Sequence, residues 1–254
     1  MTVGEGPVAA NDAPVAVVSG IVMPCPSYYE CESQAQAVLQ KGAPATLRLV
    51  AMNGTAVTTE LFRAPSSSAW TSSPHMVPAI AMGTTRGAVV ARIDGVLKLF
   101  FFDQAYHLGT IVEVARGDVG APAITFVGDE PVVAYARRAS STEPYHLELW
   151  SEGTSRSATT AASAFAPGLA TFGGELLLTW MEGDARAHGE VKVAPVPRTG
   201  PLDLRRISSI SDPATNSRDP EIAVRGTDVA LVYSEFTSVT PHGAVVVKKL
   251  TCPR

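Results

Sequence analysis

The sequence predicts an all-β fold built from a repeated unit, and three observations support this prediction. A motif of the form Pro-x-[Ile/Leu] begins at Pro122, Pro167 and Pro220, with a glycine six residues later and an aromatic residue thirteen residues later. A degenerate copy begins at Pro78 and has Ala91 in the aromatic position. Successive prolines lie 44, 45 and 53 residues apart, which is the length of one four-stranded blade of a β-propeller. Helical periodicity is nearly absent, so a propeller is the predicted architecture.

The repeat assigns four strands to each blade. The proline segment is expected to be the inner strand A, with the proline at its first residue, where no ladder hydrogen bond is lost. The glycine is expected to form the turn to strand B, whose apolar run suits a strand that is buried on both faces. The third strand, C, is expected at residues 96–102, 146–150, 190–195 and 244–248, and the outer strand, D, at residues 109–114, 156–160 and 202–207.

Two dipeptides predict hairpin turns. Asn53-Gly54 separates the β-rich residues 46–52 from residues 55–62, and Asp94-Gly95 separates residues 88–93 from residues 96–102. Both dipeptides suit the positive φ angles of a type I′ turn, which matches the twist of the paired strands.

The last repeat lacks a strand D, and this predicts how the ring closes. Residues 14–22 form a spare β-rich run, which is expected to pair with residues 244–250 and remove an open sheet edge. Residues 33–74 would then form the first of five four-stranded blades. In this interpretation residues 1–13 are a flexible N-terminal tail and residues 14–254 a single propeller domain. The alternative takes Pro14 as the start of another strand A and gives six blades.

Composition restricts the cellular setting and the partners. The chain of 254 residues is 46% apolar but only 17% charged, with a net charge of −4 and no basic stripe, so nucleic acid is not an expected partner. No apolar run is long enough for a membrane helix, and no signal peptide is visible. Cys25 and Cys31 bracket a short loop that a disulfide would close, which favours a secreted, periplasmic or cell-surface protein, with Cys252 free. The alternative is three unpaired cysteines.

The repeat resembles the blades of sialidase-like secreted β-propellers, whose units open with an inner strand of the Pro-x-Ile-Ala type. The resemblance covers residues 78–250 and implies the fold. The Asp-box of true sialidases, Ser-x-Asp-x-Gly-x-Thr-Trp, is absent, and no arginine triad matches by motif, so sialidase activity is not implied. The predicted five blades are also similar to those of arabinanase-like glycosidases, which place three carboxylates at a central cavity. No motif fixes those positions in this chain.

Candidate ligand-binding residues are those that precede each strand A, because these positions ring the mouth of a propeller channel. They are Glu32, His75, Asp118, Arg218 and Asp219. Carboxylates and a basic group around a cavity suit sugar binding or acid–base chemistry. The alternative is that Asp118 and Asp219 are turn residues, which aspartate favours.

Histidines and aromatic residues give two further patterns. His146, His188 and His242 each lie near the start of a strand C; a metal site would use such residues, but exposed hairpin histidines are the preferred interpretation. The repeated aromatic residues are expected to pack between blades, with their polar edges near water. No metal and no cofactor are expected.

The leading functional hypothesis is a non-enzymatic, monomeric propeller that binds a glycan or a protein partner. It depends on the architecture and on the lack of a catalytic motif. The alternatives are a glycoside hydrolase or lyase that uses carboxylates at the channel mouth, and a structural domain of a surface protein.

Overall fold

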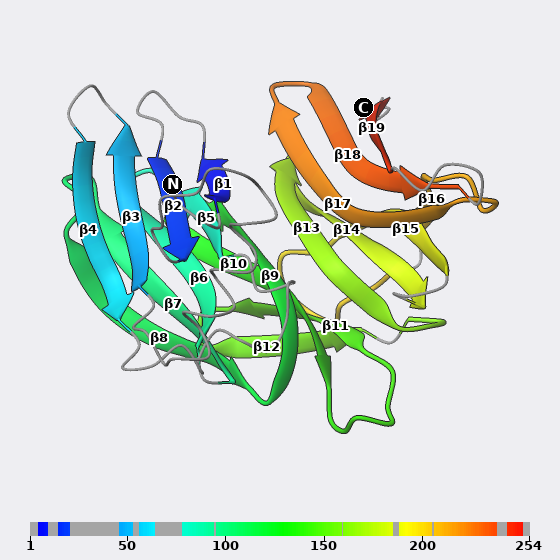
Figure 1. Cartoon of the computed structure of the whole chain (residues 1–254), viewed down its shortest axis with the longest axis horizontal. Helices are drawn as coiled ribbons and strands as arrows, with labels where there is room; N and C mark the ends of the chain where they lie inside the picture. The colour runs from blue at the N-terminus through cyan, green and yellow to red at the C-terminus, as the bar shows by residue number, and fades with distance from the viewer. Residues whose placement is uncertain are drawn as a thin grey trace, which may run out of the picture. The chain divides into compact units, whose positions relative to one another are not determined.

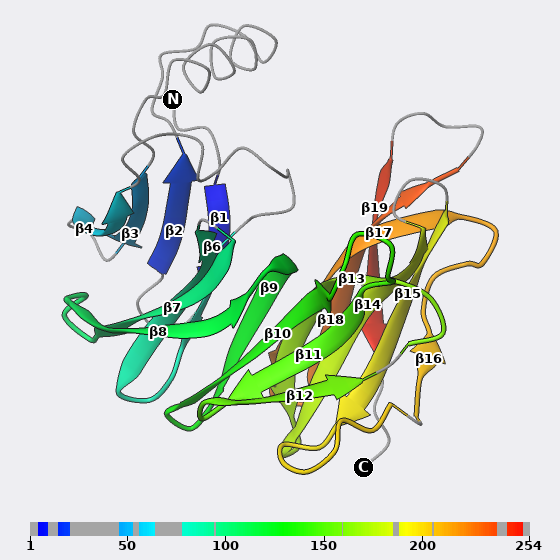
Figure 2. The ribbon, with the colours of Figure 1, turned by 90° about the horizontal axis from the view of Figure 1, so that it is seen from below.

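The computed structural model describes residues 5–9, 15–20, 46–52, 56–63, 78–93, 95–158, 160–184, 188–204, 206–237 and 243–250. Within these residues every regular element is a β-strand, and the strands form five antiparallel sheets (Figures 1 and 2). The predicted all-β fold is therefore confirmed. The chain divides into two compact units, Met1–Arg116 and Gly117–Arg254.

The first unit holds two four-stranded sheets in which each strand pairs with the next along the chain. One sheet comprises β1 (Glu5–Ala9), β2 (Val15–Gly20), β3 (Thr46–Met52) and β4 (Ala56–Arg63). The other comprises β5 (Ala79–Met82), β6 (Arg86–Ile93), β7 (Val96–Asp103) and β8 (Leu108–Arg116). Strands β1 and β5, the first of each sheet, lie against each other.

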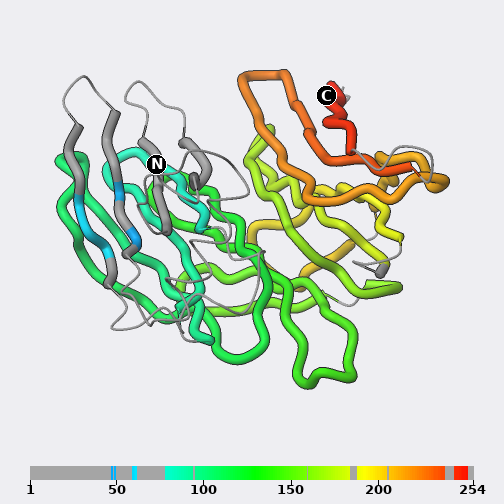
Figure 3. Tube along the Cα trace, in the orientation of Figure 1, coloured from blue at the N-terminus to red at the C-terminus, as the bar shows by residue number. Residues whose placement is uncertain are grey.

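The second unit holds three sheets with the same order of strands, which Figure 3 follows from green to red. The first comprises β9 (Asp118–Val127), β10 (Glu130–Arg138), β11 (His146–Ser151) and β12 (Thr154–Ala158). The second comprises β13 (Ala164–Phe172), β14 (Glu175–Asp184), β15 (His188–Val196) and β16 (Ser208–Ser209). The third comprises β17 (Asn216–Arg225), β18 (Asp228–Phe236) and β19 (Ala244–Leu250). Strand β13 lies between β9 and β17, so the three first strands are neighbours, as expected of inner strands.

Apolar side chains between successive sheets form the core. One cluster joins Leu147 and Leu149 of β11 to Leu176, Leu178 and Trp180 of β14. Another joins the sheet of β13–β16 to the sheet of β17–β19. Each fully buried leucine or aromatic side chain of this kind contributes roughly 1.5–3 kcal/mol through removal from water. Face-to-face packing of sheets is thus the main source of stability within the unit.

The repeated aromatic residues pack between sheets, as predicted. Trp180 lies in the first cluster and Tyr233 in the second, and both are buried, as is Tyr135. In the degenerate copy Ala91 is also buried, and Phe100 and Phe102 of the neighbouring strand β7 occupy the same cluster. In this sheet the aromatic rings of the cluster therefore come from the third strand instead of the second.

The repeat glycines and the hairpin turn behave as predicted. Gly128, Gly173 and Gly226 have φ angles of 66°, 57° and 61° in the turns after β9, β13 and β17. Gly95 has φ of 73°, and Ile93 pairs with Val96 across it. Residues 53–55 lie outside the described residues, but the flanking strands β3 and β4 pair as a hairpin.

The repeat proline does not begin the inner strand in the second unit, contrary to the prediction. Pro122, Pro167 and Pro220 lie well inside β9, β13 and β17, and the pairing register shifts beside each of them. Such bulges leave a residue unpaired, so a proline without an N–H group costs the ladder little. Only Pro78 precedes its strand, β5.

The predicted ring closure by residues 14–22 is wrong. Strand β2, within this segment, pairs with β1 on one edge and with β3 on the other, so neither edge is open to β19. Strand β1 lies inside residues 1–13, the expected flexible tail, and the first sheet uses residues 5–63 where residues 33–74 were expected. Strand β1 was not predicted because residues 5–9 contain glycine and proline, which indicate a turn. The number of blades in the propeller stays a prediction.

Candidate functional site

The inner strands of the second unit begin at one end of their sheets, which we call the rim. Here β9 starts, β10 ends and β11 starts, and the pairs Asp118–Arg138 and Arg137–His146 lie in register. Contacts continue from sheet to sheet: Ala164 N donates to the Tyr145 carbonyl at 3.0 Å, and Gly189 N donates to Asn216 Oδ1 at 2.9 Å. The rim therefore brings together polar residues from three sheets.

Asp118, a predicted site residue, lies at the rim in a network of hydrogen bonds. Its Oδ2 accepts from Arg138 Nε at 2.5 Å, and its Oδ1 accepts from the Tyr145 hydroxyl at 2.6 Å. The Arg138 guanidinium stacks 4.6 Å from the Tyr145 ring centre, and Tyr145 packs against Phe165 at 5.1 Å. The hydrogen bond to Asp118 raises the pKa of Arg138. Because both carboxylate oxygens already accept hydrogen bonds, Asp118 is placed to hold the loop between β10 and β11.

Arg218 and Asp219, the other predicted site residues in the described chain, lie together on β17. Arg218 Nε donates to Asn216 Oδ1 at 3.3 Å, and its guanidinium lies 5.4 Å from the centre of the Phe236 ring. Asp219 is exposed and has a φ of 51°, in the left-handed region, at the bulge beside Pro220. Aspartate tolerates this conformation better than most residues.

Glu221 follows on the same inner strand, although it was not among the site residues predicted from the sequence. Although its side chain reaches solvent, desolvation by the surrounding protein and repulsion by Asp219 raise its pKa. In the described part of the chain, no donor or cation pairs with the carboxylate of Asp219 or Glu221. In the sequence, the only indication of Glu221 as a site residue was that Asp219 and Glu221 stand on either side of the repeat proline. This spacing becomes informative only when the bulge beside the proline is known.

Two buried carboxylates accept hydrogen bonds from the repeated aromatic residues, and this role was not predicted from the sequence. The Tyr135 hydroxyl donates to Glu148 Oε2 at 2.6 Å, and Trp180 Nε1 donates to Glu182 Oε2 at 3.0 Å. The polar edges of Tyr135 and Trp180 are thus bonded to protein rather than placed near water as predicted, and the buried Tyr233 hydroxyl has no hydrogen-bond partner in the described residues. Basic groups lie near each carboxylate: Arg137 at 3.6 Å from Glu148, and Lys192 at 3.6 Å from Glu182.

The histidines do not gather into a metal site in the described residues. His146 Nε2 lies 3.1 Å from Glu148 Oε1, and His188 is exposed at the start of β15. His242 lies outside the described residues. Among the residues that the structure describes, no group of three His, Cys, Asp or Glu side chains is arranged to hold a metal ion.

Four predicted residues lie outside the part of the chain that the structure describes. These are the candidate ligand-binding residues Glu32 and His75 and the candidate disulfide partners Cys25 and Cys31. Their roles, and the free state of Cys252, stay predictions.

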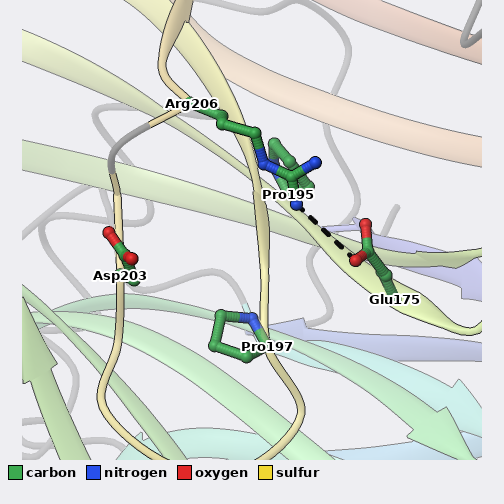
Figure 4. Close-up of a pocket in the computed structure, with 5 residues that line it drawn as sticks. All are labelled: Glu175, Pro195, Pro197, Asp203 and Arg206. Carbon is green, nitrogen blue, oxygen red and sulfur yellow. Dashed lines mark ion pairs between the residues drawn. The ribbon is translucent and has the colours of Figure 1, made fainter.

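A surface hollow of about 370 Å³ lies at the other end of the second sheet of this unit (Figure 4). Glu175 at the start of β14 and Pro195 near the end of β15 line it, together with Pro197, Asp203 and Arg206 of the following loop. Figure 4 shows the ion pair of Arg206 with Glu175, whose atoms lie 3.6 Å apart between exposed side chains. Solvent screening makes such a pair weak, and the hollow contains none of the predicted site residues.

No helix in the described residues is long and apolar enough to cross a membrane.

Comparison with known proteins identifies the fold but not a family, because no protein-family model and no curated protein matches the sequence. Among solved structures, an endo-arabinase from Bacteroides thetaiotaomicron is 8% identical, with a TM-score of 0.53 over 99% of this chain and 95% of that chain. A GH32 beta-fructofuranosidase from Bombyx mori is 10% identical, with a TM-score of 0.50 over 98% of this chain and 60% of that one. A thermostable family-43 glycoside hydrolase is 12% identical, with a TM-score of 0.46 over 69% of this chain and 68% of that one. The first two likenesses show that the chain has the β-propeller fold that the repeat predicted.

Proposed function

We propose that this chain is an extracytoplasmic, carbohydrate-binding β-propeller whose ligand contacts the rim at Arg218, Asp219 and Glu221. The observation that supports the proposal is that two carboxylates have no partner within the described chain. Asp219 and Glu221 have no cation or donor partner among the described residues, whereas Asp118, Glu148 and Glu182 all have partners. Carboxylates that the protein does not satisfy are suited to accept hydrogen bonds from the hydroxyl groups of a sugar.

The neighbouring residues complete a contact surface of suitable chemistry. Phe236 offers an aromatic ring beneath Arg218, and aromatic rings with polar groups at their edges suit the alternating apolar and hydroxyl faces of a sugar. Asp118 is assigned a supporting part, since its bonds to Arg138 and Tyr145 fix the adjacent loop. The named activities of the structural neighbours, an endo-arabinase and a beta-fructofuranosidase, agree with a glycan as the ligand class.

A second candidate function is glycoside hydrolysis, and the raised pKa of Glu221 favours it. Two carboxyl groups with different proton affinities divide the roles of proton donor and nucleophile or base in many glycosidases. Glu221, whose pKa is raised, would act as the proton donor, and Asp219 would be the second carboxyl group of the pair. Under this hypothesis the same rim both binds and cleaves the sugar.

An experiment that measures binding and turnover tests both candidate functions, glycan binding and glycoside hydrolysis. The full chain is applied to a glycan array, and the best ligand is titrated into the wild type and into Asp219→Ala and Glu221→Gln. Loss of a hydrogen bond to a charged group, worth about 1.5–3 kcal/mol, should weaken binding by roughly 10- to 150-fold. Asp228→Ala is the matched control, because Asp228 is an exposed carboxylate of the same sheet outside the rim.

Turnover separates the two functions. If the chain is a hydrolase, the bound glycan is cleaved, and Glu221→Gln stops cleavage even at glycan concentrations that saturate the weakened site. If it is a binding module, no reducing ends appear with any variant. A chain that binds no glycan and cleaves none overturns both readings and leaves the structural-domain hypothesis.

A further inference from the structure

The last sheet carries an exposed edge strand. Each of the other four sheets has four strands, but the sheet of β17–β19 has three, and β19 pairs only with β18 among the described residues. An unpaired edge presents a row of N–H and C=O groups that another strand can pair with. This edge is therefore a potential interaction surface.

The side chains of β19 are unusually apolar for an exposed edge. Val245 and Val247 are 73% and 67% exposed, the highest values among the large exposed hydrophobic residues of the described chain. They alternate with Val246, which packs toward the core cluster shared with the sheet of β13–β16. Three consecutive valines have a strong preference for paired strands, so this edge favours association rather than solvation.

The two lysines of β19 are not placed to discourage pairing at the open edge. Lysines on an edge strand normally discourage pairing. Here Lys249 Nζ lies 2.7 Å from Asp228 Oδ1 at the start of β18, and Lys248 Nζ donates to the Ile210 carbonyl at 2.9 Å. Both ammonium groups are thus engaged by parts of the chain other than the open edge.

The sequence of β19 is complementary to itself in an antiparallel register. With Val246 opposite its own copy, Val245 lies beside Val247 of the second copy and Ala244 lies opposite Lys248. Three valines of each chain then meet only valines, and cross-strand β-branched pairs of this kind contribute roughly 0.2–1 kcal/mol each. The two Lys248 residues stand four strand positions apart, about 13 Å, beyond the ~10 Å screening length at 0.1 M salt.

We propose that a second copy of this chain pairs with β19 through its own β19, giving a two-fold symmetric dimer with a continuous six-stranded sheet. The interface is isologous, as in most homodimers. This departs from the monomer expected from the sequence, and it does not depend on the proposed sugar-binding function.

Light scattering combined with size-exclusion chromatography tests the dimer. The full chain should elute with twice the mass of one copy, and Val247→Lys should return it to a monomer with unchanged circular dichroism. Ile111→Lys is the matched control, because Ile111 is 48% exposed on β8 in the other unit, and this variant should stay dimeric. A wild type that is monomeric at every concentration, or a Val247→Lys variant that stays dimeric, overturns the proposal.

Disulfide trapping tests the register. Val246→Cys should form an intermolecular disulfide mapped by mass spectrometry, since residues opposite each other in antiparallel strands have Cα atoms about 4.5–5.5 Å apart, within disulfide range. Ala244→Cys should not crosslink to its copy, because the two residues stand about 13 Å apart. Equal crosslinking of both variants, or of neither, contradicts the stated register.

Discussion

At the scale of single residues, the second unit separates carboxylates that hold the structure from carboxylates that are open to a ligand. Glu148 and Glu182 are buried and bonded to the repeated aromatic residues. Unpaired, each would cost several kcal/mol, so their partners are necessary for folding. Asp219 and Glu221 are accessible and lack such partners in the described chain. This contrast is the physical reason for assigning recognition to the second pair.

Tyr135 and Tyr233 occupy the same repeat position and predict opposite responses to loss of the hydroxyl. In Tyr135→Phe, Glu148 loses a 2.6 Å hydrogen bond, and the free energy of unfolding should fall by about 1.5–3 kcal/mol. The Tyr233 hydroxyl is buried without a hydrogen-bond partner in the described residues. Tyr233→Phe should therefore be neutral or stabilising by up to about 1 kcal/mol. Urea unfolding of both variants measures the difference, and equal losses would refute the assignment of the two hydroxyls.

Glu221 predicts a pH dependence of stability. Its pKa in the folded chain lies above the usual value of 4.5 because of desolvation and repulsion by Asp219. The folded state therefore binds this proton more tightly than the unfolded state, and stability falls as pH rises from about 4.5 through the folded pKa. Glu221→Gln should be more stable than the wild type at neutral pH, with the difference vanishing at acid pH. Thermal unfolding across pH measures this, and a difference that grows toward acid pH would contradict it.

At the scale of elements, the strands were more predictable than their exact ends. Period-two apolar runs and positive-φ turn glycines correctly predicted the strands of the second unit, because both signals are local. The bulges at Pro122, Pro167 and Pro220 were not predicted, since a bulge depends on the register with the neighbouring strand. The outer strand of the second sheet was expected at residues 202–207 and is only β16, Ser208–Ser209. Arg156 of β12 donates to the carbonyls of Pro197 and Gly200, which holds this connection as a loop.

For the candidate site, too, features that depend on the pairing of strands could not be predicted from the sequence. Asp118, Arg218 and Asp219 were predicted as residues that precede an inner strand, but Asp118 is the first residue of β9 and the other two lie inside β17. Their role in binding stays a proposal. Glu221 was not predicted, because its proximity to Asp219 arises from a bulge. The partners of Asp118, Arg138 and Tyr145, were missed because cross-strand pairing, not sequence spacing, brings them together.

The bulge in β13 predicts a stabilising substitution. Ala166 has a φ of 44° beside Pro167, and an alanine in this left-handed conformation costs roughly 1–2 kcal/mol. Glycine removes that cost but loses more entropy on folding, so Ala166→Gly should be neutral or stabilising by up to about 1 kcal/mol. Ala170→Gly is the matched control: Ala170 lies in the same strand, is buried and has an ordinary φ. It should be destabilised by about 1 kcal/mol or more. Chemical unfolding of both variants checks the ranking, and a reversed order would show that the bulge is not strained.

At the scale of the whole molecule, the repeat predicted the architecture better than it predicted the closure. The period of 44 to 53 residues led to the propeller fold, which the comparisons with an endo-arabinase and a beta-fructofuranosidase show. The predicted ring closure was wrong because residues 15–20 were paired with the last repeat only to replace its missing outer strand. No property of residues 15–20 themselves indicated that partner. Strand partners far apart in sequence are fixed by tertiary packing, which a local pattern does not encode.

The single-domain hypothesis predicts the behaviour of a fragment. The repeat period passes through the boundary between the two units without change, from Pro78 to Pro122 in 44 residues, although the chain divides at Arg116 and Gly117. In repeat architectures each unit depends on its neighbours for stability, so the full chain should unfold in one calorimetric transition. A fragment of residues 117–254 should melt well below the full chain or fail to fold. A fragment that melts at the temperature of the full chain, or two separate transitions in the full chain, would show instead that the two units are independent domains.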